Sequence, residues 1–251
     1  MKNIRPVIKT CDEKWSIREW ILSKFPENYE EMTYVEPFGG GINMLFSKNK
    51  SVREIINDKD VDVLNIYRAV RDEPLELIRK ANLFKHSQED FEKIEKRKQF
   101  EDYLDQAVND LLLRRTSKNG LKKSYIKTAN IKSWKDSISL LSQNSERLRE
   151  VFILNKSAIE SIKAFDAEDT LLYCDPPYLH DTKVSKLVYD SEIKPEDHIE
   201  LHQVLNDFSG KIILSGCISP LYKRLYKNWN MSKKRINTTK DKRTEIIWTN
   251  F

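Results

Sequence analysis

An aspartate, two prolines and a tyrosine follow a short apolar run in LLYCDPPYLH, residues 171–180. The prolines, Pro176 and Pro177, cannot continue a central strand or a helix, and they hold Asp175 and Tyr178 in a fixed relation. The carboxylate of Asp175 and the carbonyl of Pro176 can accept the two N–H bonds of an exocyclic amine on a base. The ring of Tyr178 can stack on that base once it has rotated out of a duplex.

An amine held in this way is itself a nucleophile. It can take a methyl group from a sulfonium without a covalent enzyme intermediate. Cys174 lies on the strand side of the loop, and no histidine is near it in sequence to activate it. We therefore do not expect this cysteine to act as a nucleophile.

Three glycines follow a second apolar run, in YVEPFGGGINMLF, residues 34–46. A strand, a tight glycine turn and a helix form the cofactor site of many α/β folds, because glycine lets the backbone approach a ligand closely. The stretch is not GxGxxG, and Glu36 at the strand end would repel a pyrophosphate. A carboxylate there suits a cofactor with a cationic end, such as the amino group of S-adenosylmethionine. A purely structural glycine turn would explain the same residues.

The stretch REIIND, residues 53–58, predicts a second strand that ends in Asn57 and Asp58. An acidic residue about 20 positions after a glycine turn commonly binds ribose hydroxyls. Asp58 is therefore a candidate ribose ligand. The alternative is that it caps a helix starting near Val61, a role for which Asp60 competes.

The elements that must position these residues are short strands alternating with amphipathic helices. Helical spacing of apolar residues predicts helices over residues 16–25, 61–72 and 195–208. The strand-like runs are too apolar to be half exposed, which indicates a mostly parallel sheet covered on both faces, within a doubly wound α/β fold. The predicted strands lie in TYVEPF, REIIND, VFILN, TLLYCDPP, KIILSG and TEIIWTNF.

Residues 71–150 differ from the rest, since they are polar, charged and helical in pattern and contain no strand-like run. We expect an inserted helical subdomain between two parts of one sheet. The two flanking ranges, residues 1–70 and 151–251, would then form the sheet domain.

Six segments occur in an order that resembles the Dam-like (alpha-group) DNA adenine N6-methyltransferases. They are EPFGGG, NDKDVDVLNIY, YCDPPY, EDHIELHQVL, KIILSGCISPLY and TEIIWTNF. The resemblance covers nearly the whole chain apart from a weakly similar middle. It implies a Rossmann-like S-adenosylmethionine-dependent methyltransferase sheet with an inserted helical target-recognition subdomain, and a site-specific DNA adenine methyltransferase activity that requires no metal.

Residue by residue, the resemblance implies that Asp58 binds the ribose and that residues 175–178 bind the target adenine. The family's N-terminal lysine, which lies at the active site, corresponds to Lys9 or Lys14 in PVIKTCDEKW. Asp12 and Glu13 depart from the small residues expected there. The full set implied to bind the cofactor is Lys9, Lys14, Glu36, Pro37, Phe38, Gly39, Gly40, Gly41, Asp58 and Asp175.

The expected insertion contains a long basic stretch, since residues 111–135 include no acidic residue. Asn119 and Gly120 mark a turn within it. A solvated basic face is the ordinary explanation, but the length of the stretch and its place in the insertion favour contact with double-stranded DNA. The candidate DNA-binding residues are Arg114, Arg115, Lys118, Asn119, Lys122, Lys123 and Tyr125. A second basic cluster, residues 233–243, could contact the opposite backbone or form a solvated hairpin.

Composition agrees with this interpretation. The chain has 251 residues and a formal net charge of +5, a modest excess that is compatible with an anionic partner. Its three cysteines form no CxxC pair, and no apolar run approaches the length of a membrane span. We expect a cytoplasmic protein, a monomer or weak dimer. The spacing of His198 and His202 does not make a zinc motif.

Three competing hypotheses remain at this point. Cytosine N4 methylation uses similar amine chemistry, and a catalytically silent DNA-binding protein could share the scaffold. Methylation of an asparagine or glutamine side chain in a protein is a third, which would leave the basic insertion without a purpose. The sequence does not indicate the recognition site, or whether the protein belongs to a restriction-modification system or a phage.

Overall fold

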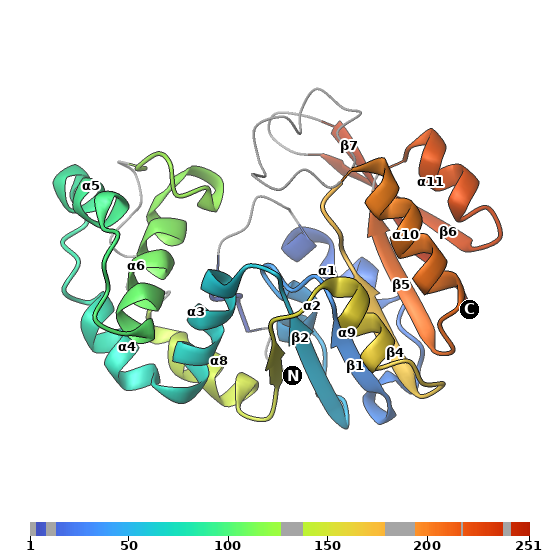
Figure 1. Ribbon diagram of the computed structural model, residues 1–251, viewed down its shortest axis with the longest axis horizontal. Helices are drawn as coiled ribbons and strands as arrows, with labels where there is room; N and C mark the ends of the chain where they lie inside the picture. The colour runs from blue at the N-terminus through green and yellow to red at the C-terminus, as the bar shows by residue number, and fades with distance from the viewer. Residues whose placement is uncertain (1–3, 9–13, 127–137, 179–193, 217, 238–241) are drawn as a thin grey trace. The chain divides into compact units, whose positions relative to one another are not determined.

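The computed structural model describes residues 4–8, 14–126, 138–178, 194–216, 218–237 and 242–251 (Figure 1). Lys9, one of the two candidate N-terminal lysines, lies outside them. Contacts between Cα atoms divide the chain into two compact units. The first comprises Met1–Glu19, Gly40–Asn49 and Asp58–Asn155, and the second comprises Trp20–Gly39, Lys50–Asn57 and Lys156–Phe251. The boundaries at residues 71 and 150 stay a prediction.

A seven-stranded sheet forms the core, in the order β3-β2-β1-β4-β5-β7-β6. The pairs β1 with β2, β1 with β4, and β4 with β5 are parallel, whereas β7 pairs antiparallel with β5 and β6. The strands are β1 (Thr33–Glu36), β2 (Arg53–Asn57), β3 (Phe152–Leu154), β4 (Thr170–Cys174), β5 (Lys211–Gly216), β6 (Asn230–Asn237) and β7 (Lys242–Thr249). Strand order reverses at β1 and β4, as in doubly wound sheets, and the predicted α/β fold class is confirmed.

The parallel strands form because their residues are apolar on both faces. Every residue of β4 is buried, and in β1, β2 and β5 only the first residue is not. Strand β6 was not predicted, because its sequence NMSKKRIN is mostly polar. It lies at an edge of the sheet, where charged side chains are tolerated and prevent pairing with another chain.

In the second unit, α9 (Ala158–Ala164) and α10 (Pro195–Asn206) lie side by side in front of β4 and β5 in the view of Figure 1. The short helices η1 (Tyr29–Glu31) and α11 (Pro220–Leu225) also belong to this unit. His198 of α10 is buried, with Nδ1 2.9 Å from the hydroxyl of Tyr222 in α11. Trp248 of β7 lies in the core, as its sequence context predicted.

The first unit is built around α6 (Tyr103–Thr116), whose residues are mostly buried. Helices α3 (Val61–Asp72), α4 (Pro74–Ala81) and α5 (Gln88–Lys96) pack against α6, and α8 (Leu141–Leu148) packs against α3. Helix α1 (Lys14–Leu22) extends into the second unit, while α2 (Asn43–Ser47) and η2 (Lys118–Gly120) are short. The predicted helices over residues 61–72 and 195–208 are confirmed, the second ending two residues earlier.

Candidate active site

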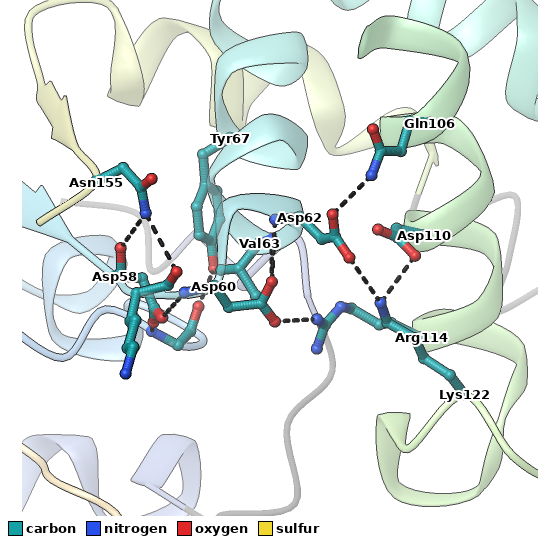
Figure 2. A network of polar contacts seen from close by, with 12 residues as sticks. Asp58, Asp60, Asp62, Val63, Tyr67, Gln106, Asp110, Arg114, Lys122 and Asn155 are labelled. Atoms are coloured by element: carbon teal, nitrogen blue, oxygen red, sulfur yellow. Dashed lines mark hydrogen bonds and ion pairs between the residues drawn. The ribbon is translucent and has the colours of Figure 1, made fainter. Parts of the chain in front are cut away.

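Gly40, in the glycine turn, is held by two hydrogen bonds to residues of the first unit, Asp58 and Tyr67, which Figure 2 labels. Gly40 has a φ of +47°, in the left-handed region that favours glycine. Its N–H donates to Oδ2 of Asp58 at 2.7 Å, and its carbonyl accepts from the hydroxyl of Tyr67 at 2.6 Å. A Cβ built on Gly40 would meet no atom within 4 Å, so the glycine is required by its backbone conformation and not by crowding.

Both carboxylate oxygens of Asp58 accept backbone N–H groups. Oδ2 accepts from Gly40, and Oδ1 accepts from Asp60 at 2.8 Å. Burial raises the pKa of Asp58, and the bonds from Asp60 and Gly40 oppose that rise. The helix-capping role that competed for this residue belongs to Asp60, whose Oδ1 accepts from the N–H groups at the start of α3. Asp58 therefore fixes the glycine turn.

Glu36 ends β1 in the second unit and is 2% exposed. Tyr34, two residues earlier on the same face of the strand, donates its hydroxyl to Oε1 of Glu36 at 2.8 Å. Burial, together with the nearby charge of Glu36, raises the pKa of Tyr34 far above its usual value, so the hydroxyl stays a donor. The bond fixes one carboxylate oxygen of Glu36 at the strand end.

Asn57 stabilises the segment that follows Glu36. Its Nδ2 donates to the carbonyl of Pro37 at 2.9 Å, and its backbone carbonyl accepts from the N–H of Gly39 at 2.7 Å. The side chain is fully buried and also bonds both backbone groups of Lys156. Pro37 and Gly39 are buried, while Phe38 is half-buried. Asn57 was not predicted to support the site, although a buried amide at a strand end is a usable signal.

Gly41 and Lys14, the remaining described cofactor candidates, both lie in the first unit. Gly41 is buried two residues before the start of α2. Lys14 is the first residue of α1 and only 1% exposed. A lysine is seldom so fully buried unless its charge is paired.

The segment after β4 places the amine-binding candidates at the carboxyl end of that strand. Asp175 and Tyr178 are half-buried and Pro176 is buried, with Pro177 half-buried between them. The hydroxyl of Tyr178 donates to Oε2 of Glu245 in β7 at 2.7 Å. Glu245 was missed in the sequence, where it lies 67 positions from its partner.

Cys174, the last residue of β4, is fully buried. Burial, with the adjacent Asp175, raises the pKa of its thiol far above the usual value. A thiol that resists ionisation is a poor nucleophile. This agrees with the prediction that Cys174 takes no covalent part in the reaction.

Several candidate DNA-binding side chains make contacts within the first unit (Figure 2). Arg114 pairs with Asp60 at 2.9 Å, and Lys122 pairs with Asp110 at 2.8 Å and Asp62 at 3.6 Å. Gln106 of α6 also donates to Asp62 at 2.7 Å. The acids that pair with Arg114 and Lys122 therefore come from α3, α6 and the residue before α3.

The other candidates differ in their exposure. Arg115 donates to the carbonyl of Pro6 at 3.0 Å, and burial lowers its pKa to about 10. Tyr125 donates its hydroxyl to the carbonyl of His86. Lys118 is exposed at the start of η2, Lys123 is exposed beyond it, and Gly120 has a φ of +73° that forms the predicted turn. Asn119 is described by its backbone alone within η2. DNA contact by all seven residues stays a prediction.

No helix within the described ranges has the length and apolar character needed to span a membrane.

Comparisons with known proteins identify relatives over nearly the whole chain. A Type II methyltransferase of Lactococcus lactis subsp. cremoris, M1.LlaDCHI, is 29% identical over 282 aligned positions, which cover 99% of this chain and 96% of the relative. Two solved structures are also similar. The putative methyltransferase yhhF from Escherichia coli has a TM-score of 0.36 and 9% identity, and covers 99% of this chain and 88% of its own. The rRNA methyltransferase aviRa from Streptomyces viridochromogenes has a TM-score of 0.43 and 11% identity, with 93% and 82% covered.

The family comparison is specific about the reaction. Residues 13–244 match the family described as D12 class N6 adenine-specific DNA methyltransferase. The match includes the glycine turn, Asp58 and the segment from Asp175 to Tyr178. The chain therefore belongs to the D12 class of N6 adenine-specific DNA methyltransferases, and its substrate is adenine in DNA.

Proposed function

We propose that the chain transfers the methyl group of S-adenosylmethionine to N6 of an adenine rotated out of double-stranded DNA, with Asp175 and Tyr178 holding the base. The observation that carries the proposal is the register of β1 and β4, which pairs Val35 with Leu172. Glu36 ends β1 and Asp175 directly follows β4, so both lie at the carboxyl ends of neighbouring parallel strands, where strand order reverses and where open α/β sheets bind ligands.

The residues present fit S-adenosylmethionine. Tyr34 holds one carboxylate oxygen of Glu36, and the negative charge of this carboxylate suits the amino group of the methionine end. The turn from Gly39 to Gly41 offers backbone groups. Each carboxylate oxygen of Asp58 accepts one backbone N–H and has a second lone pair that could accept a ribose hydroxyl. When bound, this cofactor supplies an electrophilic methyl group on a sulfonium.

Asp175 and Pro176 act on the amine of the base. Their carboxylate and carbonyl oxygens each accept one N–H of N6, which draws the nitrogen toward a tetrahedral geometry with its lone pair free. Asp175 also offers an acceptor for the proton that N6 loses once the new N–C bond has formed. Tyr178 stacks on the base, and no residue of the chain forms a covalent bond to it.

The test is Asp175→Ala, assayed for tritium transfer from labelled S-adenosylmethionine to DNA and for cofactor affinity by calorimetry. We expect methylation to be abolished and the dissociation constant for the cofactor to stay close to that of the unsubstituted chain, because Glu36, the glycine turn and Asp58, which we propose hold the cofactor, are unchanged. Asp169→Ala is the matched control, because Asp169 is exposed at the other end of β4 and should leave both quantities unchanged. Methylation retained by Asp175→Ala would refute the proposed mechanism.

A catalytically silent DNA-binding protein is the alternative that this experiment also addresses. Calorimetry of the unsubstituted chain that shows no binding of S-adenosylmethionine would support it. Sequencing of methylated adenines in DNA from cells that express the protein would establish activity and recognition sequence together.

A further inference from the structure

The contact between Tyr178 and Glu245 joins the base-binding loop to the antiparallel end of the sheet. The hydroxyl of Tyr178 donates to Oε2 of Glu245 at 2.7 Å and lies 3.5 Å from Oγ of Ser215. All three residues belong to the second unit. The contact is therefore internal to one compact body.

Strand register places Glu245 where it can make this contact. In the pairing of β5 with β7, Gly216 lies opposite Ile246, so Glu245 comes just beyond the carboxyl end of β5. In the pairing of β4 with β5, Cys174 lies opposite Leu214, so β4 ends at the same edge. The loop that begins at Asp175 therefore starts at the edge that Glu245 flanks.

The chemistry of the pair calls for an explanation that base stacking does not provide. Stacking requires an aromatic ring alone, and a phenylalanine would supply it. A carboxylate that is 1% exposed, as in Glu245, is costly to bury unless donors satisfy it. Burial and the charges of Asp175 and Glu245 raise the pKa of Tyr178 far above its usual value, so its hydroxyl remains protonated and able to donate.

We propose that Glu245 is a positioning residue for adenine methylation, which holds the ring of Tyr178 in its stacking orientation through the tyrosine hydroxyl. The backbone beside Pro177 fixes one end of the side chain, and Glu245 fixes the other. Two fixed ends restrict rotation of the ring, so less conformational freedom is lost when the base enters. This inference rests on the proposed role of Tyr178.

The experiment is a double-substitution cycle on the full chain, with the recognition sequence first identified by sequencing methylated adenines. The single-turnover rate of methyl transfer is measured on a duplex that contains one site, for Y178F, E245Q and the double variant. We expect E245Q to lower the rate about tenfold with Tyr178 present and less than about twofold in the Y178F background, because the amide oxygen of glutamine accepts a weaker, uncharged hydrogen bond and this difference requires the tyrosine hydroxyl. An equal loss in both backgrounds would overturn the inference, since Glu245 would then act without the hydroxyl.

Three further measurements separate positioning from other effects. The dissociation constant for DNA should change less than about twofold in E245Q, because the ring itself remains. Fluorescence of 2-aminopurine at the target position should report altered stacking in E245Q and Y178F, and an unaltered signal would contradict the inference. Glu54→Gln is the matched control, since Glu54 is also a buried strand glutamate, and it should leave the rate and the fluorescence unchanged.

Failure of the underlying proposal is distinguishable from failure of this inference. If Tyr178 does not stack on the base, Y178A will be as active as Y178F, whereas a stacking ring makes Y178A far slower. Urea unfolding confirms that each variant is folded. Should E245Q fail to fold, Glu245→Asp gives the same comparison, because it keeps the charge but shortens the side chain by one methylene.

Discussion

Asp58 and Asp60, beside the glycine turn, allow the same aspartate-to-asparagine substitution to be compared at two positions. We expect a large loss of stability at Asp58 and a small one at Asp60. Asp58 uses both carboxylate oxygens to accept backbone N–H groups, from Gly40 at 2.7 Å and Asp60 at 2.8 Å. Asp60 caps α3 with one oxygen and pairs with Arg114 through the other. An asparagine has one acceptor oxygen and one amide nitrogen. It can therefore replace one function of each residue but not both.

For Asp58→Asn, one backbone N–H loses a charged acceptor and faces an amide donor instead. Since a hydrogen bond to a charged group contributes about 1.5 to 3 kcal/mol, we expect the free energy of unfolding to fall by about 2 kcal/mol. For Asp60→Asn the cap persists, because asparagine caps helices as well as aspartate does. The substitution removes the ion pair between Asp60 and Arg114. Because the Asp60 side chain is 45% exposed, we expect the free energy of unfolding to fall by less than about 1 kcal/mol.

The assay is urea unfolding followed by circular dichroism, with affinity for S-adenosylhomocysteine measured by calorimetry. With a denaturant slope of about 2 to 3 kcal/mol per molar, Asp58→Asn should lower the midpoint by about 0.7 to 1 M. The affinity of Asp58→Asn for S-adenosylhomocysteine, the product expected from the proposed reaction, should fall about tenfold, because binding must then also order the glycine turn. The reasoning fails if Asp60→Asn costs as much as Asp58→Asn, or if Asp58→Asn leaves the midpoint unchanged.

Further predictions concern stability and DNA binding. Burial lowers the pKa of His198 below its usual 6.5. The stability that this residue contributes is therefore present above pH 6.5 and is lost as the pH falls toward its folded-state pKa. Urea midpoints measured across this pH range should depend less on pH in His198→Asn. Gly210→Ala should lower the free energy of unfolding by at least about 2 kcal/mol in the same assay, because a Cβ there would lie 2.4 Å from the carbonyl oxygen of Thr170. An unchanged urea midpoint would contradict this expectation. Lys118→Ala should reduce the slope of DNA affinity against salt by about one, as measured by fluorescence anisotropy, while Lys122→Ala should leave the slope unchanged and lower stability.

The parts of the fold that the sequence predicted are those with a strong periodic signal. Helix α3 was predicted at its observed bounds, because its apolar residues recur on one face and Asp60 precedes it. The buried strands were predicted because their apolar runs are short and end at polar residues. Strand β6 was missed because its exposed and partly buried side chains alternate but are mostly polar, a pattern that also suits a solvated hairpin.

The supporting contacts of the candidate site were harder to predict, because they join distant segments. Glu245 reaches Tyr178 only because β7 runs antiparallel beside β5. No local pattern in TEIIWTNF indicates that this strand lies between β5 and β6. Asn57 was placed at a strand end, but its bonds to Pro37 and Lys156 depend on where those backbones pass. Local motifs indicate which residues carry the chemistry, whereas their partners depend on sheet order.

The basic stretch shows how contact geometry refines a prediction from charge. Residues 111–135 contain no acid, yet Arg114 and Lys122 pair with acids from outside that range. The two pairs differ in how readily they can be exchanged for a DNA phosphate. Asp60 is 45% exposed, so water can solvate it when Arg114 leaves, whereas Asp110 is 10% exposed and would remain a poorly solvated charge without Lys122. We therefore expect Arg114 to exchange Asp60 for a phosphate more readily than Lys122 can leave Asp110.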